Sequence, residues 1–528
     1  MKRIYSFTTI LILTISTLVA QTPYTNESFM PTDLIGSARY VGMSGALGAL
    51  GADISAGNAN PAALGLYRRS DVGMTFSVLT QQEKPNLDAD MTHMSFDQFG
   101  FVLSLPFYGK NLNYLNFGIN YNKRANFNQS FIAGNNVLNG LSQTQQIADI
   151  LNNTQYSTPL ANLMYDACLV NPIYERNPSN GEVILDENGD PKYYSYDAFN
   201  ADQNQFDRTT EGGIAGYDFN ISMNFNDRVY VGFTLGVSDV DYFSYSTYRE
   251  YFNTQDGPDE LYSLYNAHNI NGYGINAKFG AIVRPIETSA FRVGLAVETP
   301  TFYHLESYNS YSIDSPISED DNFELWYGDF NTYRPEYDLF PLLMRIKTPW
   351  KVKVSAGHTI GKFLALGAEY EFANYGGTRQ TYEDLEYGYT NKDSNMDNLY
   401  KNILCGSHSF KFGMELNLID NLSLRAGYNY YSKLFNKDSK LDQTGESPAF
   451  NYQTTTDFMN KGDVNIFTAG LGYHGKHLYV DVAYKYRMQT GTFYAFDDTY
   501  ISNDTYQLSP VDVNLNNHQV FLSLGYKF

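Results

Sequence analysis

The C-terminal end of the chain alternates between apolar and polar side chains, and this period of two constrains the fold more than any other feature of the sequence. One face of residues 518–528 carries Val520, Leu522, Leu524, Tyr526 and Phe528. The opposite face is polar apart from Phe521. Because successive side chains of a β-strand point to opposite sides, the pattern predicts a strand with one face in apolar and one in wet surroundings.

The same alternation recurs in the interior of the chain, where the second face carries charge. Residues 229–238, 422–430 and 478–487 all alternate, and Arg425 and Lys485 lie on the polar faces of the last two. Charges are costly in lipid, so if the apolar faces contact a membrane, the charged faces line a wet lumen. A soluble β-sandwich also alternates, but it turns its polar face to water.

Residues 1–20 have the form of a secretory signal peptide. Lys2 and Arg3 give a positive start, residues 10–19 are apolar or carry hydroxyl groups, and Ala20 ends a plausible cleavage site. No later window holds the ~18 consecutive apolar residues that a transmembrane helix needs. A secreted soluble protein would satisfy these facts alone, so the strand pattern has to decide.

The amino-acid composition also bears on the fold and on the possible partners. The chain holds 46 Tyr and 35 Phe but 2 Trp, and its formal net charge is −21. Tyrosine suits the boundary between lipid and water because its ring is apolar and its hydroxyl is wet. A strongly acidic chain argues against nucleic acid as a partner, since phosphate binding needs a basic surface.

We predict an all-β protein, a 14-stranded antiparallel transmembrane β-barrel over residues 71–528. An even number of strands puts both ends of a bacterial barrel on the same side, and short and long connections alternate along the chain. The predicted strands are 71–80, 95–107, 113–125, 213–225, 228–248, 270–285, 290–312, 345–360, 362–376, 406–418, 421–435, 463–474, 477–490 and 515–528.

The longest predicted loop, residues 126–212, contains two stretches with helical spacing, 142–152 and 159–170. Two readings stay open. The helices pack on their own loop, or they offer an apolar collecting surface for a greasy ligand. The candidate capture residues are Leu160, Leu163 and Met164.

Residues 21–70 precede the first predicted strand and do not alternate. Within 36–66, Gly42, Gly45, Gly48 and Gly51 recur at every third position among small residues. Small residues allow close backbone packing, which suits a plug, or hatch, inside a crowded lumen. The spacing does not match a dinucleotide-binding fingerprint.

On these residues the chain resembles the FadL-type outer-membrane transporters of long-chain fatty acids and other hydrophobic compounds. The resemblance is carried by the small-residue segment and by Asn60, Pro61 and Ala62, an Asn-Pro-Ala sequence like that of the family's hatch. It continues in Thr299-Pro300, in Thr348-Pro349-Trp350 and in Leu424-Arg425-Ala426-Gly427-Tyr428. It covers nearly all of the mature chain, although the loops are idiosyncratic.

The resemblance implies passive transport through a hatch-gated barrel, with a side exit beside a kinked third strand near 113–125. It also implies a multi-pass barrel in the bacterial outer membrane, with both termini periplasmic. The terminal Phe528 looks like the sorting signal read by the outer-membrane barrel assembly machinery. The expected partners are outer-membrane lipid, lipopolysaccharide and a hydrophobic small molecule, and we expect a monomer.

Several basic residues should face the lumen, because they lie on the polar side of the alternation in their strands. They could hold the carboxylate of a ligand: Arg425, Lys485, Arg487, Lys353 and Arg292. The alternative is that these residues pair with inward acidic residues and stabilise the wall. Those candidates are Glu415, Asp481, Glu369 and Glu298. Perturbed charge is only a probabilistic signal of a site, so both readings stay open.

No motif indicates a cofactor, a metal site or an enzyme. A barrel-embedded lipase or protease would need a nucleophile and a base within reach, and no signature surrounds the scattered Ser and His. A diffusion porin or a haem-uptake protein is the other alternative, although porins lack a hatch and active receptors need a larger plug. Cys168 and Cys405 could form a disulfide or remain two free thiols.

Overall fold

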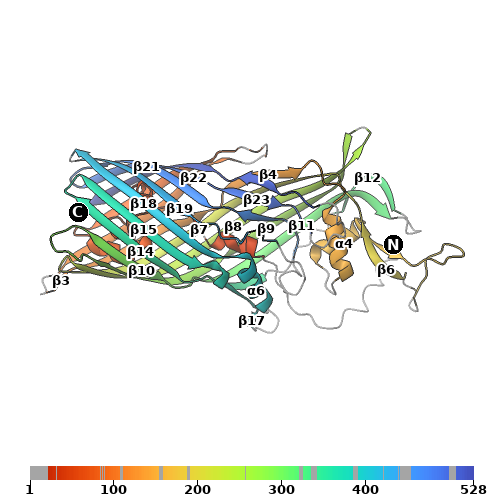
Figure 1. Ribbon diagram of the computed structural model, residues 1–528, viewed down its shortest axis with the longest axis horizontal. Helices are drawn as coiled ribbons and strands as arrows, with labels where there is room; N and C mark the ends of the chain where they lie inside the picture. The colour runs from red at the N-terminus through yellow and green to blue at the C-terminus, as the bar shows by residue number, and fades with distance from the viewer. Residues whose placement is uncertain are drawn as a thin grey trace.

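The computed structural model is a closed antiparallel barrel of 14 strands in which β1 pairs with β25 (Figure 1). It describes residues 22–528 except 31, 84, 86, 88, 89, 108–110, 154–157, 187, 188, 190, 256, 320–324, 334–341, 384–389, 420, 438, 441–452 and 499–506, so the predicted signal peptide lies outside the described residues. The wall strands are β1 (Asp71–Gln81), β2 (Thr92–Pro106), β3 (Leu112–Asn126), β7 (Gln203–Phe225), β8 (Val229–Thr254), β9 (Gly257–Val283), β10 (Arg292–Glu298), β11 (Phe302–Glu319), β13 (Leu342–Lys347), β14 (Lys351–Ile360), β15 (Leu364–Asn374), β18 (Gly406–Ile419), β19 (Leu422–Tyr431), β21 (Val464–His474), β22 (Leu478–Met488) and β25 (Asn517–Lys527).

Two of the predicted strands are each divided by a proline. Pro300 separates β10 from β11, and Pro349 separates β13 from β14. Proline has no N–H to give to the ladder, so the wall is interrupted at the same level in both strands. Thr301 and Thr348 repair the break, because the amide of each donates to an oxygen of the other.

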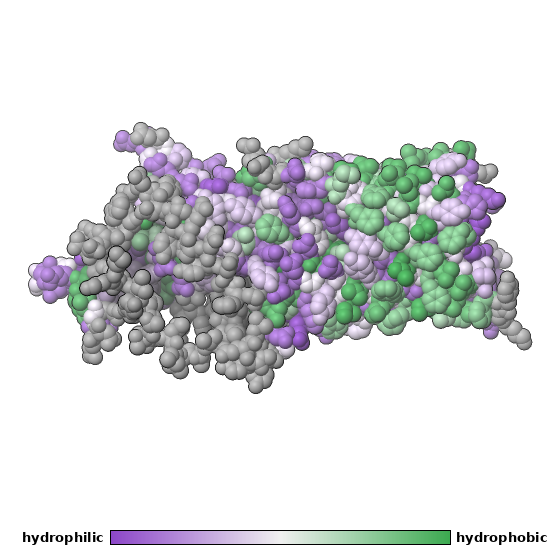
Figure 2. Space-filling view, turned by 180° about the vertical axis from the view of Figure 1, so that it is seen from behind, coloured by the Kyte–Doolittle hydropathy of each residue, from purple (hydrophilic) through white to green (hydrophobic). Residues whose placement is uncertain are grey.

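The outer surface of the barrel carries a broad apolar belt. On β25, Val520, Leu522, Leu524 and Tyr526 are exposed while Phe521 is fully buried, as the alternation predicts. Figure 2 shows this hydrophobic surface gathered over the end of the barrel that holds the C terminus. We call that end the turn end and the opposite end the loop end. Among the described residues no helix is long and apolar enough to cross a membrane.

Beyond the belt, the wall continues as a long extension at the loop end. β8 and β9 remain paired up to Thr254 and Gly257, so the predicted long loop 249–269 is wrong. The prediction failed because residues 249–260 are mostly charged or polar and show no regular apolar alternation. The two strands continue because the backbone N–H and C=O groups of β8 and β9 remain paired with each other.

A folded cap covers the loop end of the barrel. The remaining elements near it are β4 (Gln129–Asn135), α4 (Gln143–Asn153), α5 (Pro159–Asp166), β5 (Val170–Tyr174), β6 (Tyr193–Ala198), β12 (Leu325–Tyr333), η3 (Tyr375–Gly377), β16 (Arg379–Glu383), β17 (Thr390–Lys392), α6 (Ser394–Ile403), β20 (Phe458–Lys461), β23 (Thr490–Tyr494) and β24 (Val511–Asn514). Leu160, Leu163 and Met164 are 1% exposed or less inside its hydrophobic core. These three side chains therefore cannot form an exposed collecting surface, and the reading that the loop packs on itself holds for them.

The two cysteines do not form a disulfide. Cys168 follows α5 in the cap, and the Cys405 thiol donates to the carbonyl oxygen of Lys433 at 3.6 Å.

The buried carboxylate of Glu250 joins the cap to the wall extension. Its oxygens accept from the Gln143 amide at 2.7 Å and from the hydroxyls of Ser142 and Tyr248. The carboxylate therefore caps the first turn of α4, where a helix has N–H groups without internal partners. Burial raises the pKa of Glu250 to about 7, against the hydrogen bonds that lower it.

The cap should lose stability as pH rises from about 4.5 to about 7. The folded state holds the Glu250 proton in that window and the unfolded state does not, so the stabilisation is present below the unfolded pKa and lost towards the folded pKa. The loss is about 3 kcal/mol at most, at 1.36 kcal/mol per pKa unit. We expect the amides of α4 to exchange faster at pH 8 than at pH 5 after correction for intrinsic rates. Glu250→Gln should abolish the difference, and a difference that persists in this variant would contradict the assignment.

The N-terminal segment runs inside the barrel from the loop end to the turn end (Figure 1). It forms five short helices: α1 (Pro23–Asn26), η1 (Glu27–Phe29), α2 (Ala38–Gly42), α3 (Ala56–Ala59) and η2 (Pro61–Leu66). Tyr24 stacks on Phe435 at the loop end, whereas the Asn116 amide donates to Leu64 O near the turn end. The C terminus lies at the turn end, while the first described residues lie among the loops.

A row of glycines in the wall makes room for this segment. Gly357, Gly367, Gly413 and Gly427 are direct neighbours on four successive strands. A Cβ on Gly367 would overlap the carbonyl oxygen of Ala46, and one on Gly413 would overlap that of Met43. The hatch therefore rests directly on bare backbone of the wall.

Candidate functional site

The Asn-Pro-Ala sequence anchors the hatch in the wall between β9 and β10. The Asn60 side-chain amide donates to the carbonyl oxygens of Ala281 at 3.3 Å and Leu295 at 3.4 Å. Its oxygen accepts from the Ala62 amide and caps η2, which Pro61 begins. Glycines at 280 and 294 leave the space that Asn60 fills. These residues thus hold the backbone of the hatch and do not line an open path.

Three ion pairs fasten the hatch along the height of the barrel. Glu27 is paired with Lys461 at 2.6 Å, Asp33 with Lys485 at 2.8 Å and Arg39 with Glu415 at 2.9 Å. Each joins one hatch residue to one residue of the surrounding protein. A hatch that moves must break at least one of these pairs, so they set part of the energy barrier to opening.

Four of the five candidate ligand-binding cations already have local partners. Arg425 is fully buried and pairs with Glu415 at 2.6 Å and with Asp481 at 2.5 Å. Lys485 pairs with Asp33, as described above. Lys353 lies 3.5 Å from Glu298 and also contacts Glu371 and Asn58 O, while Glu369 pairs with Lys411. Arg292 donates to Leu50 O of the hatch at 3.4 Å. The wall-stabilising pairs thus exist for Arg425 and Lys353.

Arg487 resembles Arg292, which also has no ion pair among the described residues, and differs from the other three. Its guanidinium donates to the Gln489 side-chain oxygen at 2.7 Å, and among the described residues no carboxylate lies within ion-pair distance of it. It lines a cavity of the lumen, which we call the main cavity, whereas Arg292 does not. Arg487 is therefore the candidate cation best placed to meet an anionic group.

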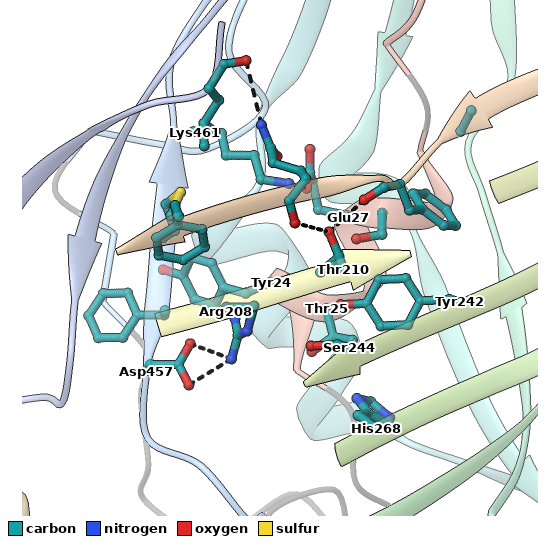
Figure 3. A pocket seen from close by; sticks show the side chains of 18 of the residues that line it. Tyr24, Thr25, Glu27, Arg208, Thr210, Tyr242, Ser244, His268, Asp457 and Lys461 are labelled. Atoms are coloured by element: carbon teal, nitrogen blue, oxygen red, sulfur yellow. Dashed lines mark hydrogen bonds and ion pairs between the residues drawn. The ribbon is translucent and has the colours of Figure 1, made fainter. Parts of the chain in front are cut away.

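That cavity lies under the cap, against the first residues of the hatch, and measures about 240 Å³ (Figure 3). Its apolar wall includes Met30, Leu79, Phe127, Phe131, Tyr242, Phe458 and Leu515. Its polar wall includes Glu27, Arg208, His268, Asp457, Lys461 and Arg487. Arg208 is paired with Asp457 at 2.9 Å. The mixture suits an amphipathic molecule better than a purely apolar one.

A second cavity of about 130 Å³ lies deeper, between the hatch and the wall. It is lined by Lys278, Lys351, Lys353 and Lys411 opposite Glu298 and Glu371, with Tyr40, Tyr303, Tyr375 and Tyr431 around them. This part of the lumen is therefore polar.

One histidine and serine pair borders the main cavity but lacks the features of a catalytic dyad. His268 Nε2 and Ser307 Oγ are 2.8 Å apart. Burial and the nearby Arg208 lower the pKa of His268 to about 3, too low for a base that works near neutral pH. Among the described residues no carboxylate is hydrogen-bonded to the ring. The pair is therefore structural.

Comparison with known proteins decides the fold. No family model and no curated protein matches the sequence. Among solved structures, a Pseudomonas aeruginosa FadL homologue aligns with 94% of this chain and 99% of its own length, at 12% identity and a TM-score of 0.50. The chain has the FadL-type fold. A Ralstonia pickettii toluene transporter, TbuX, and the monoaromatic hydrocarbon channel CymD align at 11% identity, with TM-scores of 0.45 and 0.44. They cover 94% and 93% of this chain and 99% and 97% of their own.

In this FadL-type barrel the third strand is irregular where the resemblance placed a kink. The ladder between β2 and β3 ends at the pair Gln98–Asn122, whereas β2 stays paired with β1 up to Thr92. The register of β3 then shifts between Lys123 and Ala125. Residues 92–97 therefore lack a ladder partner on the β3 side.

Side chains close this interruption. The Gln81 side chain of β1 makes the two hydrogen bonds that a neighbouring strand would make. Its side-chain oxygen accepts from the Ser130 backbone N–H at 2.9 Å, and its side-chain nitrogen donates to the Ser130 carbonyl oxygen. Leu79, Asn128 and Gln129 border both the interruption and the main cavity. Met94, 84% exposed, lies on the outer side. At this place side chains, and no β-ladder, separate the main cavity from the outer surface. We call this place the Gln81 door.

The sequence analysis did not identify the hatch residues that form the ion pairs with the surrounding protein. Glu27, Asp33 and Arg39 are charged residues of a segment otherwise rich in small and hydroxyl-bearing residues, as are Asp53, Arg68 and Arg69. That contrast was a usable signal, since a buried charge needs a partner. Arg208 and Asp457 carried no such signal, because they lie 249 positions apart and meet only through the fold.

Proposed function

We propose that the protein is an outer-membrane channel for passive transport of hydrophobic or amphipathic compounds. The main cavity between cap and hatch, next to the interrupted β2–β3 ladder, carries this proposal. A molecule captured there would leave sideways past Gln81 once the hatch has moved, into the membrane that surrounds the apolar belt, without crossing the whole lumen. Burial of each CH₂ group gains about 0.8 kcal/mol, which favours transfer into lipid without an energy source.

Within this class we propose a long-chain fatty acid, or a similar molecule with one anionic head. The cavity offers an apolar wall for the chain, and Arg487 has no carboxylate partner among the described residues. The similar structures include proteins named for toluene and monoaromatic hydrocarbons, which are neutral. A neutral hydrocarbon would leave the polar side of this cavity without partners, at a cost in desolvation.

The proposal is tested by uptake of labelled oleate in cells that lack their own outer-membrane transporter. Expression of this protein should restore uptake. Arg487→Gln should reduce uptake of oleate about tenfold, the equivalent of ~1.4 kcal/mol, and leave uptake of an uncharged alkane analogue unchanged. Lys476→Gln, at the turn end, is the matched control.

No uptake by an assembled wild-type barrel would contradict the transport of this ligand class. An equal loss for both compounds in Arg487→Gln would contradict the role of Arg487 as the binder of the anionic head.

A further inference from the structure

A block of basic residues lies on the outer surface, just above the apolar belt on the loop side. Arg345 and Lys347 are on β13, and Arg379 is on β16. Lys347 is directly opposite Arg379, and Arg345 is directly opposite His304 of β11. We call these four residues the basic patch. In a chain with a net charge of −21, cations gathered in adjacent strands stand out.

The pairing of Lys347 with Arg379 is unfavourable on its own. Like charges directly opposite on neighbouring strands destabilise a sheet. Arg345 is partly neutralised by Glu383 at 3.1 Å, and Arg379 by Asp397 at 3.4 Å. Lys347 has no ion-pair partner among the described residues. The patch therefore keeps excess positive charge that an external anion would neutralise.

Aromatic residues border the patch on the belt side. Phe302 is 48% exposed and directly opposite Lys347, whose ammonium lies 5.5 Å from the ring centroid. Trp350 is 56% exposed three residues further along the chain. Tyr273, opposite His304, is 48% exposed, with its hydroxyl 2.9 Å from the ring Nδ1. Apolar rings on one side and cations on the other match the two ends of an anionic lipid.

We propose that the basic patch binds the phosphorylated glycolipid of the outer leaflet. Phosphate oxygens lie between Lys347 and Arg379 and accept from the Arg345 guanidinium, while the acyl chains lie along Phe302 and Trp350. The site rests on the belt lying in a membrane with the loop end outward, and it does not depend on what the lumen transports. A basic residue near a membrane surface is attracted to anionic lipid headgroups.

The test uses the full-length protein in detergent, with diphosphorylated lipid A added in mixed micelles and bound lipid counted by native mass spectrometry. Wild type should retain the lipid. Lys347→Gln with Arg379→Gln should weaken retention at least tenfold, and Lys476→Gln should behave as wild type. Lipid A stripped of both phosphates should bind all three proteins equally weakly.

A second measurement separates binding from damage to the fold. In detergent without lipid, Lys347→Gln alone should unfold at the same temperature as wild type or higher, because it removes the repulsion with Arg379 and leaves the Arg379–Asp397 ion pair in place. Added diphosphorylated lipid A should raise the unfolding temperature of wild type only. Equal retention of phosphorylated and stripped lipid by wild type, or unchanged retention by the double variant, would overturn the proposal.

Discussion

Replacing Gly367 by valine should unseat the hatch. A Cβ at this position would overlap the carbonyl oxygen of Ala46, and backbone cannot give way as a flexible side chain can. Overpacking in a dense interior costs typically 1–3 kcal/mol and more where backbone must shift. The barrel itself should still assemble, because Gly367 remains paired with Gly357 and Gly413 through main-chain groups.

The measurement is proteolysis of intact cells and entry of a large antibiotic that the outer membrane normally excludes. Gly367→Val should expose hatch residues to external protease and raise antibiotic sensitivity. Gly377→Val is the matched control, since a Cβ there meets nothing within 4 Å. A Gly367→Val barrel as tight and as protease-resistant as wild type would show that the hatch does not depend on this contact.

The wall could be predicted from the sequence because a barrel strand is a local pattern. Alternation between lipid and lumen repeats every second residue, and the boundary of β25 and the inward direction of Phe521 followed from it directly. The extensions of β8 and β9 could not be predicted because residues 249–260 are mostly charged or polar, although Tyr248, Leu261 and Leu264 of the extension are buried. Pro300 and Pro349 are visible in the sequence, but that they lie side by side depends on register.

The candidate site was only partly predictable for a different physical reason. Parity shows that Arg425 and Lys353 face inward, but whether an inward charge is neutralised depends on distances across the barrel. Asn60 and Pro61 were found through a resemblance, and the structure shows them pinned against β9 and β10. The hatch residue Asp33, which partners Lys485, comes from a segment with no periodic pattern. Its ion-pair partner lies 452 positions away along the chain, so no local rule could reveal the pair.

Locking the hatch to the wall should abolish transport if the hatch must move. Ser44 of the hatch and Thr468 of β21 are buried with their side-chain oxygens 2.9 Å apart, and Thr468 also donates to Gly42 O. Side chains this close are good positions for an engineered disulfide, which needs Cβ atoms roughly 3.5–4.5 Å apart. We expect Ser44→Cys with Thr468→Cys, in a background with Cys168→Ser and Cys405→Ser, to form the bond on oxidation.

Oxidised cells should take up labelled oleate at the background rate, and a reductant should restore uptake to the level of the Ser44→Cys single variant. The bond leaves the barrel wall and the cap unchanged, so the loss would come from the hatch alone. A gradual opening at the Gln81 door would need no movement at Ser44, and it would leave uptake intact in the oxidised protein. Loss of uptake on oxidation and its recovery with reductant would show that the hatch must move. Uptake that is intact in the oxidised protein would show that the hatch is a fixed plug beside a side exit.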